Sequence, residues 1–299
     1  MRRFLTKLAA LALATTLGGC AMGSLPPSQW VVLGGLAAVA PQNAYHLQSG
    51  LSYGPERRER LDVYTPAQRA PGPRPVVVWA YGGSLQRGER GVYGFIGEAF
   101  TRLGYPTVVF DYRLYPTVPA DHLTDDPALA LAWVARHAAE FGGDGTRIIL
   151  AGHSAGAFLW AALSADPARL LAAGVNPADV AAVLGISGAY ALKPPYPKQM
   201  TKMLSAMPDP AALQPVSYAK PGGPPFILLH GSKDDTLSVE NARAFVVRLR
   251  ALGRAVEYQE YANADHYSLL LYLSSALRDG SLEFSNVRTA LARLNLDPW

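Results

Sequence analysis

The sequence predicts an α/β protein with a mostly parallel central sheet and helices on both faces of that sheet. Apolar, strand-like runs alternate with helix-like segments along most of the chain, and this alternation is typical of parallel sheets covered by helices. Several runs are apolar without interruption, as strands buried on both faces require. One of them, residues 148–151, passes through Gly-x-Ser-x-Gly directly into an alanine-rich segment that favours a helix.

Composition and charge are those of a folded domain. The chain has 299 residues, of which 49% are hydrophobic and 17% charged, enough for a sizeable core in one large domain or two small ones. Arg2, Arg3 and Lys7 account for most of the formal net charge of +4. Without residues 1–19 the chain has 24 basic residues against 23 acidic ones, a net charge of about +1. No basic stripe remains, which argues against a nucleic-acid partner.

The first 19 residues have the pattern of a bacterial export signal. A cationic start precedes the apolar run 8–17, which is too short to span a bilayer because spanning requires about 20 residues. The run leads into Leu-Gly-Gly-Cys, ending at Cys20, the only cysteine of the chain. This tetrapeptide resembles the lipobox of bacterial lipoproteins. The resemblance implies lipidation of Cys20 and, because Ala21 follows, an outer-membrane anchor facing the periplasm; the alternative is an ordinary signal peptide with an incidental cysteine.

Residues 20–50 show no clear period and are predicted to be a lipidated tether and an irregular N-terminal segment. Apolar and polar residues alternate over 61–64, which is typical of an edge strand. Uninterrupted apolar runs predict buried strands, and a last strand follows them; in chain order these cover residues 75–80, 106–110, 147–151, 180–186, 226–229 and 256–261.

Helices are predicted between these strands. Asp126 followed by Pro127 predicts an N-cap and the first position of a helix that ends near Glu140. Ser238 is predicted to cap a second helix, because apolar residues recur after it with helical spacing. These residues are Ala242, Phe245, Val246, Leu249 and Leu252, with Arg243, Arg248 and Arg250 on the solvent side.

The stretch 190–225 breaks the alternation. It contains nine prolines and several large apolar side chains between two predicted core strands. Two interpretations remain open for it: a small cap over a functional site, or a plain surface crossover.

Residues 152–156, Gly-His-Ser-Ala-Gly, have the pattern of a nucleophile elbow, a sharp strand-to-helix turn that holds one serine exposed and strained. The flanking glycines are needed because a Cβ at either position would clash as the chain doubles back. The pentapeptide alone is weak evidence, but the strand before it and the helix after it supply the required context. Ser154 is therefore predicted to be the nucleophile of a serine hydrolase.

A serine nucleophile needs a base, and the base needs an orienting acid. In folds with this elbow the chain order is serine, acid, histidine. His266 follows the last predicted strand and is predicted to be the base, whereas His153 is expected to point away from the serine and His230 to be structural. Asp234, just past the strand 226–229, is the predicted acid, with Asp235 as the open alternative.

Acyl transfer also requires donors for the tetrahedral oxyanion. The N–H of Ala155, directly after the nucleophile, is one predicted donor. Gly82 and Gly83 follow the strand 75–80 and are predicted to supply the others, because glycine lets the backbone approach the substrate.

Together these motifs resemble the esterase/lipase families related to hormone-sensitive lipase. Residues 81–84, Tyr-Gly-Gly-Ser, are similar to the His-Gly-Gly-x oxyanion loop, and residues 111–116, Asp-Tyr-Arg-Leu-Tyr-Pro, to the segment Asp-Tyr-Arg-Leu-Ala-Pro. The resemblance covers roughly residues 50–275 and implies an α/β-hydrolase domain over 51–299. Tyr81 replaces the usual histidine, which affects side-chain support of the loop but not its backbone donors, and Tyr115 replaces the usual alanine.

The resemblance is closest to small carboxylesterases of the group that includes feruloyl esterases, acetyl-xylan esterases and arylformamidases. It implies hydrolysis of short-chain or aromatic acyl esters through an acyl-enzyme on Ser154, with a small-molecule ester as partner. No His, Cys or carboxylate cluster has metal-ligand spacing, so no metal or cofactor is expected. The alternatives are an arylformamidase or amidase with the same triad, and a non-catalytic envelope protein of the same fold. The oligomeric state is left open.

Overall fold

The computed structural model describes residues 27–68, 72–277 and 282–296. The predicted signal peptide over residues 1–19 and the predicted lipidation site Cys20 lie outside the described residues. In the part of the chain that is described, no helix is long and apolar enough to cross a membrane.

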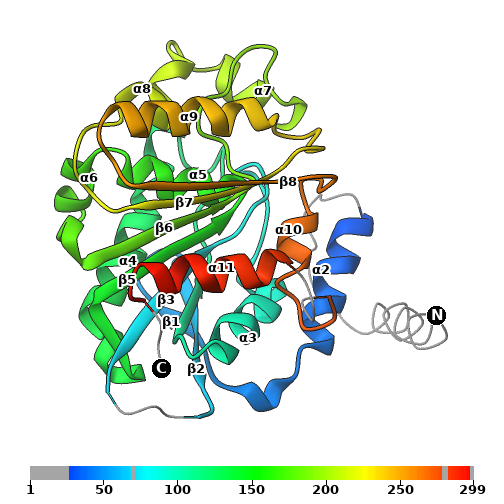
Figure 1. Cartoon of the computed structure of the whole chain (residues 1–299), viewed down its shortest axis with the longest axis vertical. Helices are drawn as coiled ribbons and strands as arrows, with labels where there is room; N and C mark the ends of the chain where they lie inside the picture. Colours follow the sequence, from blue (N-terminus) through cyan, green and yellow to red (C-terminus); the bar gives the residue numbers. More distant parts are fainter. Residues whose placement is uncertain (1–26, 69–71, 278–281, 297–299) are drawn as a thin grey trace.

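The described strands form a single sheet in the order β1-β2-β4-β3-β5-β6-β7-β8 (Figure 1). β2 runs antiparallel to both of its neighbours, and the remaining pairs are parallel. The predicted mostly parallel sheet is therefore confirmed. The strands are β1 (Tyr45–Ser52), β2 (Arg60–Pro66), β3 (Arg74–Ala80), β4 (Thr107–Phe110), β5 (Gly143–His153), β6 (Val180–Ile186), β7 (Phe226–Gly231) and β8 (Val256–Tyr261).

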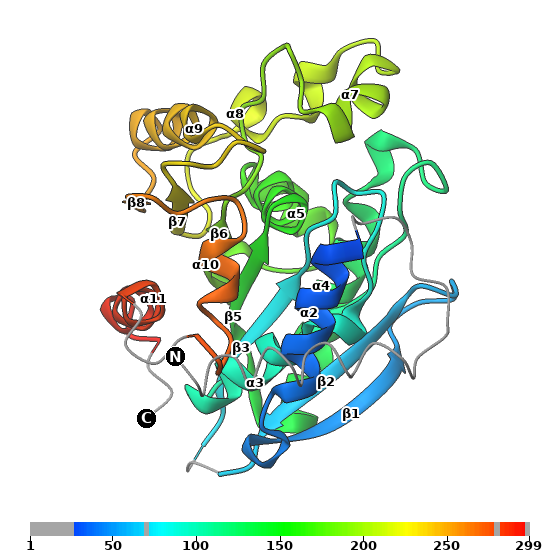
Figure 2. The same ribbon diagram turned by 90° about the vertical axis from the view of Figure 1, so that its right-hand side faces the viewer.

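Helices cover both faces of the sheet. α3 (Gly94–Arg102) and α11 (Leu282–Arg293) lie on one face, and α4 (Asp125–His137), α5 (Ala155–Ser164) and α9 (Val239–Ala251) lie on the other (Figures 1 and 2). Shorter helices connect them: α6 (Pro167–Ala172), α10 (Ser268–Leu271), and the 3-10 turns η2 (Gln42–Ala44), η3 (Arg90–Tyr93), η4 (Ala120–His122), η5 (Ala138–Phe141) and η6 (Pro177–Asp179).

Large aromatic side chains fill the space between the sheet and its helices. Trp79 of β3, Phe110 of β4 and Trp160 of α5 are fully buried, and the rings of Phe110 and Trp160 lie 5.5 Å apart. Burying one such side chain contributes roughly 1.5–3 kcal/mol. This packing holds α5, which begins at the nucleophile elbow, against β3 and β5.

The N-terminal segment is more regular than the sequence predicted. α2 (Pro27–Val39) packs against η3 and α3, and β1 pairs with β2 as the edge strand of the sheet. The predicted strand at 61–64 exists, but the prediction that it is an edge strand is wrong, because β2 lies between β1 and β4. The sheet begins with β1 at Tyr45. The sequence did not predict β1 because most of its side chains are exposed on both faces. Apolar and polar residues therefore do not alternate along it as they do in a half-buried strand.

The predicted helices have the expected positions, with one wrong cap. Ser238 accepts the Glu240 N–H at the start of α9, as predicted. Asp126, however, lies inside α4, where the helix already begins at Asp125. Its buried carboxylate instead accepts the backbone N–H of Arg113 at 2.6 Å and the guanidinium of the same residue. A charged partner from a neighbouring loop has thus replaced the capping contact.

The predicted insertion 190–225 leaves the sheet after β6 and returns at β7. It contains α7 (Lys198–Ser205), η7 (Pro210–Leu213) and α8 (Pro215–Tyr218), and α7 and α8 lie beyond α9 at one end of the molecule (Figures 1 and 2). The buried side chain of Gln214, just before α8, accepts the Leu192 N–H at 3.0 Å and so connects the start of the insertion to α8.

Candidate active site

The nucleophile elbow forms between β5 and α5. Ser154 has φ 54° and ψ −118°, a strained left-handed conformation that non-glycine residues seldom adopt. Gly156 allows the close approach that this turn needs, because a Cβ there would lie 1.9 Å from the carbonyl oxygen of Ala80. The N–H of Ser154 donates to the Ile186 carbonyl at 2.9 Å, which fixes the turn to β6.

The structure brings Ser154, His266 and Asp234 together from three distant segments. His266 Nε2 lies 2.9 Å from Ser154 Oγ, and His266 Nδ1 lies 2.8 Å from Asp234 Oδ2. All three residues are at least 92% buried. The hydroxyl therefore donates to an imidazole whose other nitrogen donates to a carboxylate, the arrangement in which a serine can lose its proton as it attacks.

Asp234 is held as a carboxylate. Its Oδ1 accepts the N–H groups of Thr236 at 3.0 Å and Leu237 at 2.7 Å. Burial alone raises the pKa of this group, but hydrogen bonds with His230 and His266 hold it well below its usual range. Asp235, the alternative acid, is exposed and contacts the hydroxyl of Thr236 at 3.4 Å, so the structure pairs His266 with Asp234.

Two further histidines contact this relay, and sequence reasoning gave them no part in it. His230 Nε2 donates to the Leu237 carbonyl at 2.8 Å and lies 3.2 Å from Asp234 Oδ2. His153 Nε2 lies 2.8 Å from the main-chain oxygen of His266. The sequence signal for His230 is its position four residues before Asp234 at the same strand end, and that for His153 is its position next to the nucleophile.

Two of the predicted oxyanion residues, Gly82 and Ala155, lie next to the serine. A Cβ on Gly82 would lie 3.0 Å from Ser154 Cβ, so the backbone of this loop runs directly against the nucleophile. Gly83 has φ +139°, and its carbonyl accepts the N–H groups of Gln86 and Arg87. Ala155 is the first residue of α5, and an N–H in the first turn of a helix has no intrahelical acceptor. The backbone at Gly82 and the start of α5 therefore both lie next to Ser154.

A buried phenol supports the oxyanion loop in place of the histidine of similar families. The hydroxyl of Tyr81 donates to Asp111 Oδ1 at 2.9 Å and accepts from Arg58 Nη2 at 2.8 Å. The ring of Tyr81 stacks on that of Tyr112 at 4.6 Å, and the Tyr112 hydroxyl donates to the Tyr81 carbonyl at 2.7 Å. Side-chain support of the loop is thus present, in a different chemical form.

Two arginines complete this network. Arg58 donates to the carbonyl oxygens of Tyr112 and Gly88. Arg90 binds Asp111 Oδ2 at 2.6 Å and Asp62 Oδ1 at 2.8 Å. Buried carboxylates are stable only with such partners. The network therefore connects the oxyanion loop to β2 through charges that all have a counter-ion.

Tyr115, the second departure from the similar families, also supports this loop. Its N–H donates to the carbonyl of Leu85 at 2.8 Å, so the backbone of the segment 111–116 holds the end of the oxyanion loop.

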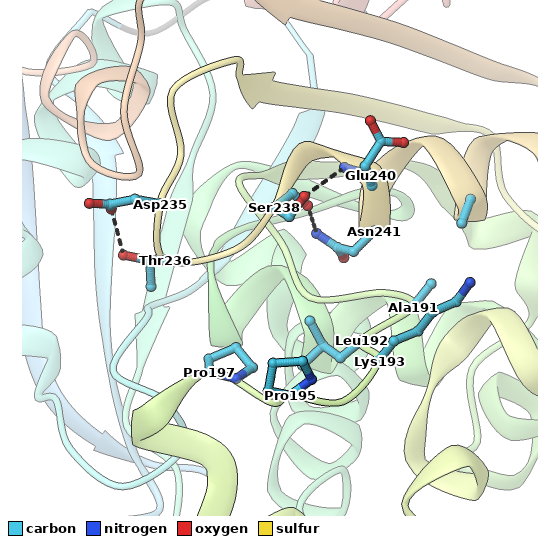
Figure 3. A pocket seen from close by; sticks show the side chains of 11 residues that line it. Ala191, Leu192, Lys193, Pro195, Pro197, Asp235, Thr236, Ser238, Glu240 and Asn241 are labelled. Carbon is cyan, nitrogen blue, oxygen red and sulfur yellow. Dashed lines mark hydrogen bonds between the residues drawn. The ribbon is translucent and has the colours of Figure 1, made fainter.

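A pocket of about 380 Å³ lies beside the loop that carries the acid. Asp235 and Thr236 form one side of it, and Pro195 and Pro197 of the insertion form another (Figure 3). The same loop supplies the N–H groups that hold Asp234. None of Ser154, Asp234 and His266 lines this pocket, but one of its walls belongs to the loop that follows Asp234, and another belongs to the insertion. Among the described residues, no group of three or more His, Cys, Asp or Glu could hold a metal ion.

Known proteins resemble this chain along most of its length. Esterase LipQ of Mycobacterium tuberculosis is 36% identical over 250 residues, covering 76% of this chain and 58% of the relative. The isoprenylcysteine α-carbonyl methylesterase ICME of Arabidopsis thaliana is 27% identical over 262 residues, covering 79% of this chain and 60% of the relative. The chain thus spans less than two thirds of the length of these relatives.

Solved structures show the same fold. Esterase B from Lactobacillus rhamnosis superimposes with a TM-score of 0.73 at 18% identity, covering 99% of this chain and 98% of that one. Esterase 2 of Thermogutta terrifontis gives a TM-score of 0.67 at 23% identity, covering 86% and 97%. The family model BD-FAE matches residues 61–249. The chain therefore belongs to the BD-FAE family of α/β-hydrolase esterases.

Proposed function

We propose that the protein is a carboxylesterase that works through a covalent acyl-enzyme on Ser154. The observation that carries this proposal is the relay of two hydrogen bonds, 2.9 Å and 2.8 Å long, from Ser154 Oγ through His266 to Asp234. The relatives support ester rather than amide hydrolysis, because they are named an esterase and a methylesterase.

The geometry suggests two half-reactions. Ser154 Oγ attacks the ester carbonyl carbon while His266 Nε2 takes the hydroxyl proton, and the backbone around Gly82, Gly83 and Ala155 stabilises the oxyanion. As the tetrahedral intermediate collapses, His266 returns this proton to the leaving alcohol oxygen. A water molecule then attacks the acyl-enzyme and gives its proton to His266. The second collapse releases the carboxylic acid and restores the Ser154 hydroxyl.

The proposed substrates are short-chain or aromatic acyl esters. The alternative is an arylformamidase or amidase, which would use the same three side chains. Comparing kcat/KM for p-nitrophenyl acetate and N-formylkynurenine distinguishes the two, since each class of enzyme favours its own substrate.

Labelling with a fluorophosphonate tests the role of Ser154. We expect the probe to label the wild type and the Ser217→Ala control, in which an exposed serine is removed, but not Ser154→Ala. Loss of a nucleophile serine typically lowers kcat by about 10³-fold or more, so Ser154→Ala should lose ester turnover to that extent. If Ser154→Ala is labelled as fast as the wild type, Ser154 is not the nucleophile.

A further inference from the structure

His153 is a buried histidine next to the nucleophile that the proposed mechanism does not use. Only 2% of its surface is exposed. Its ring lies 4.9 Å from the ring of His266 and 5.6 Å from that of Tyr267. The ring therefore fills the space under the loop that carries the proposed base.

The contacts of His153 determine which of its nitrogens carries the proton. Nε2 lies 2.8 Å from the main-chain oxygen of His266, and a carbonyl oxygen only accepts, so Nε2 must donate. The opposite side of the ring faces the oxyanion loop, because a Cβ on Gly82 would lie 2.9 Å from Nδ1. One imidazole thus contacts the loop of the base and the loop of the oxyanion, and its own backbone belongs to the elbow.

The same surroundings keep this imidazole neutral. Burial, and next the proximity of the His266 imidazole, lower the pKa of His153 to about 3. The hydrogen bond to the His266 main-chain oxygen and the charge of Asp234 raise this pKa, but by less. Neutrality matters during turnover because His266 becomes a cation in each half-reaction. A second cation beside it would oppose that step.

We infer that His153 is a positioning residue whose Nε2–H holds the main chain of His266 at the distance from which its imidazole reaches Ser154 Oγ. The inference rests on the proposed function, in which His266 is the base. A displacement of about 1 Å between reacting groups costs about 100-fold in rate. Loss of this one hydrogen bond should therefore lower kcat while leaving ester binding nearly unchanged.

The test compares two variants. His153→Gln keeps a neutral N–H donor at a similar distance from the backbone, and His153→Leu removes the donor. We expect His153→Leu to lower kcat about 10- to 100-fold with KM changed less than about 2-fold, and His153→Gln to stay within about 3-fold of wild type. The rate of fluorophosphonate labelling should follow kcat, because it requires the Ser154–His266 pair and no ester-binding site.

Several results would overturn the inference. Wild-type kcat in a folded His153→Leu protein would do so, as would equal losses in both variants when thermal unfolding shows both to be folded. If His153→Leu does not fold, histidine NMR of the wild type decides instead. His153, assigned by its absence in His153→Gln, should carry its proton on Nε2 without titrating between about pH 5 and pH 8.

The NMR measurement does not depend on activity, so it separates this inference from the proposed function. A wild-type protein that shows the expected tautomer but hydrolyses no ester would refute the function alone. A protein whose Ser154 is labelled but whose His153 titrates in this range, or carries its proton on Nδ1, would refute the role of His153 alone.

Discussion

The hydroxyl of Tyr81 connects the oxyanion loop to two charged side chains, Asp111 and Arg58. Tyr81 itself is fully buried. A buried hydroxyl with an acceptor and a charged donor is fixed in orientation, since each partner determines one direction of its hydrogen bonding. The residue that follows it, Gly82, lies against Ser154. Fixing Tyr81 therefore also fixes the position of Gly82, the first of the two proposed oxyanion glycines.

Removing that hydroxyl should affect both stability and rate. Tyr81→Phe leaves one donor of Arg58 and one oxygen of Asp111 without this partner, and losing such a buried hydrogen bond costs about 1–3 kcal/mol in the free energy of unfolding. We expect kcat for p-nitrophenyl acetate to fall about 10-fold or more, because weakening one oxyanion donor costs up to about 10²–10³-fold. Urea unfolding and steady-state kinetics measure the two effects.

Tyr53→Phe is the matched control for Tyr81→Phe. The buried hydroxyl of Tyr53 donates to the main-chain oxygen of Asp111 at 2.5 Å, so its loss also costs stability. It does not contact the oxyanion loop, and kcat should stay near the wild-type value. Equal losses of kcat in the two variants would show that the rate effect comes from general destabilisation around Asp111.

The three residues of the proposed triad were predictable from sequence, but the long-range contacts around them and around the glycine loop were not. Ser154, Asp234 and His266 follow from a local motif, a strand end and a fixed chain order. The contact of His153 with the carbonyl of His266 spans 113 residues, and that of Tyr81 with Asp111 spans 30. No local pattern marks such pairs, because they form only when the sheet brings its strand ends together.

At the scale of helices and strands, the predictable elements are those buried in a regular way. The runs that form β3, β4, β6 and β7 are mostly apolar because both of their faces are covered. α2 was not predicted, since Gly34 and Gly35 and the valines around them lower helix propensity. Its packing against η3 and α3 compensates for that weakness. Tertiary contacts, rather than local preference, thus determine the N-terminal part of the fold.

One buried side chain attaches the insertion to the element that follows the triad acid. Asn241 of α9 accepts the Tyr190 N–H at 2.7 Å and donates to the Ser238 carbonyl at 2.7 Å. Tyr190 begins the insertion, and Ser238 caps α9 just past the loop of Asp234. The pocket between insertion and acid loop (Figure 3) includes Asn241 in its lining.

Asn241→Ala should loosen this attachment. The Tyr190 N–H loses its acceptor in a buried place, which costs about 1–3 kcal/mol in the free energy of unfolding. Because one wall of the pocket then becomes mobile, we expect KM across a series of acyl esters to change more than the rate of fluorophosphonate labelling. Urea unfolding measures the loss of stability, and steady-state kinetics on acetyl, butyryl and aromatic esters measures the change of KM.

Asn176→Ala serves as the control for the insertion. Asn176 is exposed and caps η6 by accepting the Ala178 N–H at 3.1 Å. Loss of such a cap costs about 0.5–2 kcal/mol. Asn176 lies at the amino end of β6, whereas the insertion and the pocket follow the carboxyl end of this strand. The ester selectivity of the Asn176→Ala variant should match that of the wild type. A selectivity change of the same size in both variants would mean that the insertion does not set substrate preference.

For the molecule as a whole, the free energy of unfolding should depend on pH, because several titratable groups have a different pKa in the folded and the unfolded chain. Partial burial raises the pKa of Asp144, Asp166, Asp234 and Asp265, but hydrogen bonds outweigh it, so that each pKa is lowered. At the first three a cationic neighbour also lowers the pKa. A carboxyl with a lowered pKa stabilises the fold above its unfolded pKa of about 4. That contribution is lost as the pH falls through the folded pKa. These carboxyls therefore make the stability depend on pH only in acid, below about pH 4.

His153 adds an earlier stage to this loss. The pKa of His153 is about 6.5 in an unfolded chain. In the folded protein burial, and to a smaller extent the nearby His266, lower this pKa to about 3. Between these values the unfolded chain binds a proton that the folded chain does not. The free energy of unfolding should therefore decrease as the pH falls from about 6.5, by up to about 1.4 kcal/mol per pH unit.

Urea unfolding of the wild type and His153→Gln at steps from about pH 7 to pH 4.5 measures this contribution. The wild type should lose stability over this range, and His153→Gln should lose distinctly less because it cannot take up the proton on unfolding. His122 acts in the opposite direction, since Asp125 raises its pKa, and it is exposed; repeating the series in a His122→Gln background removes that effect. Parallel curves for the two proteins in this background would mean that His153 is not held neutral by the fold.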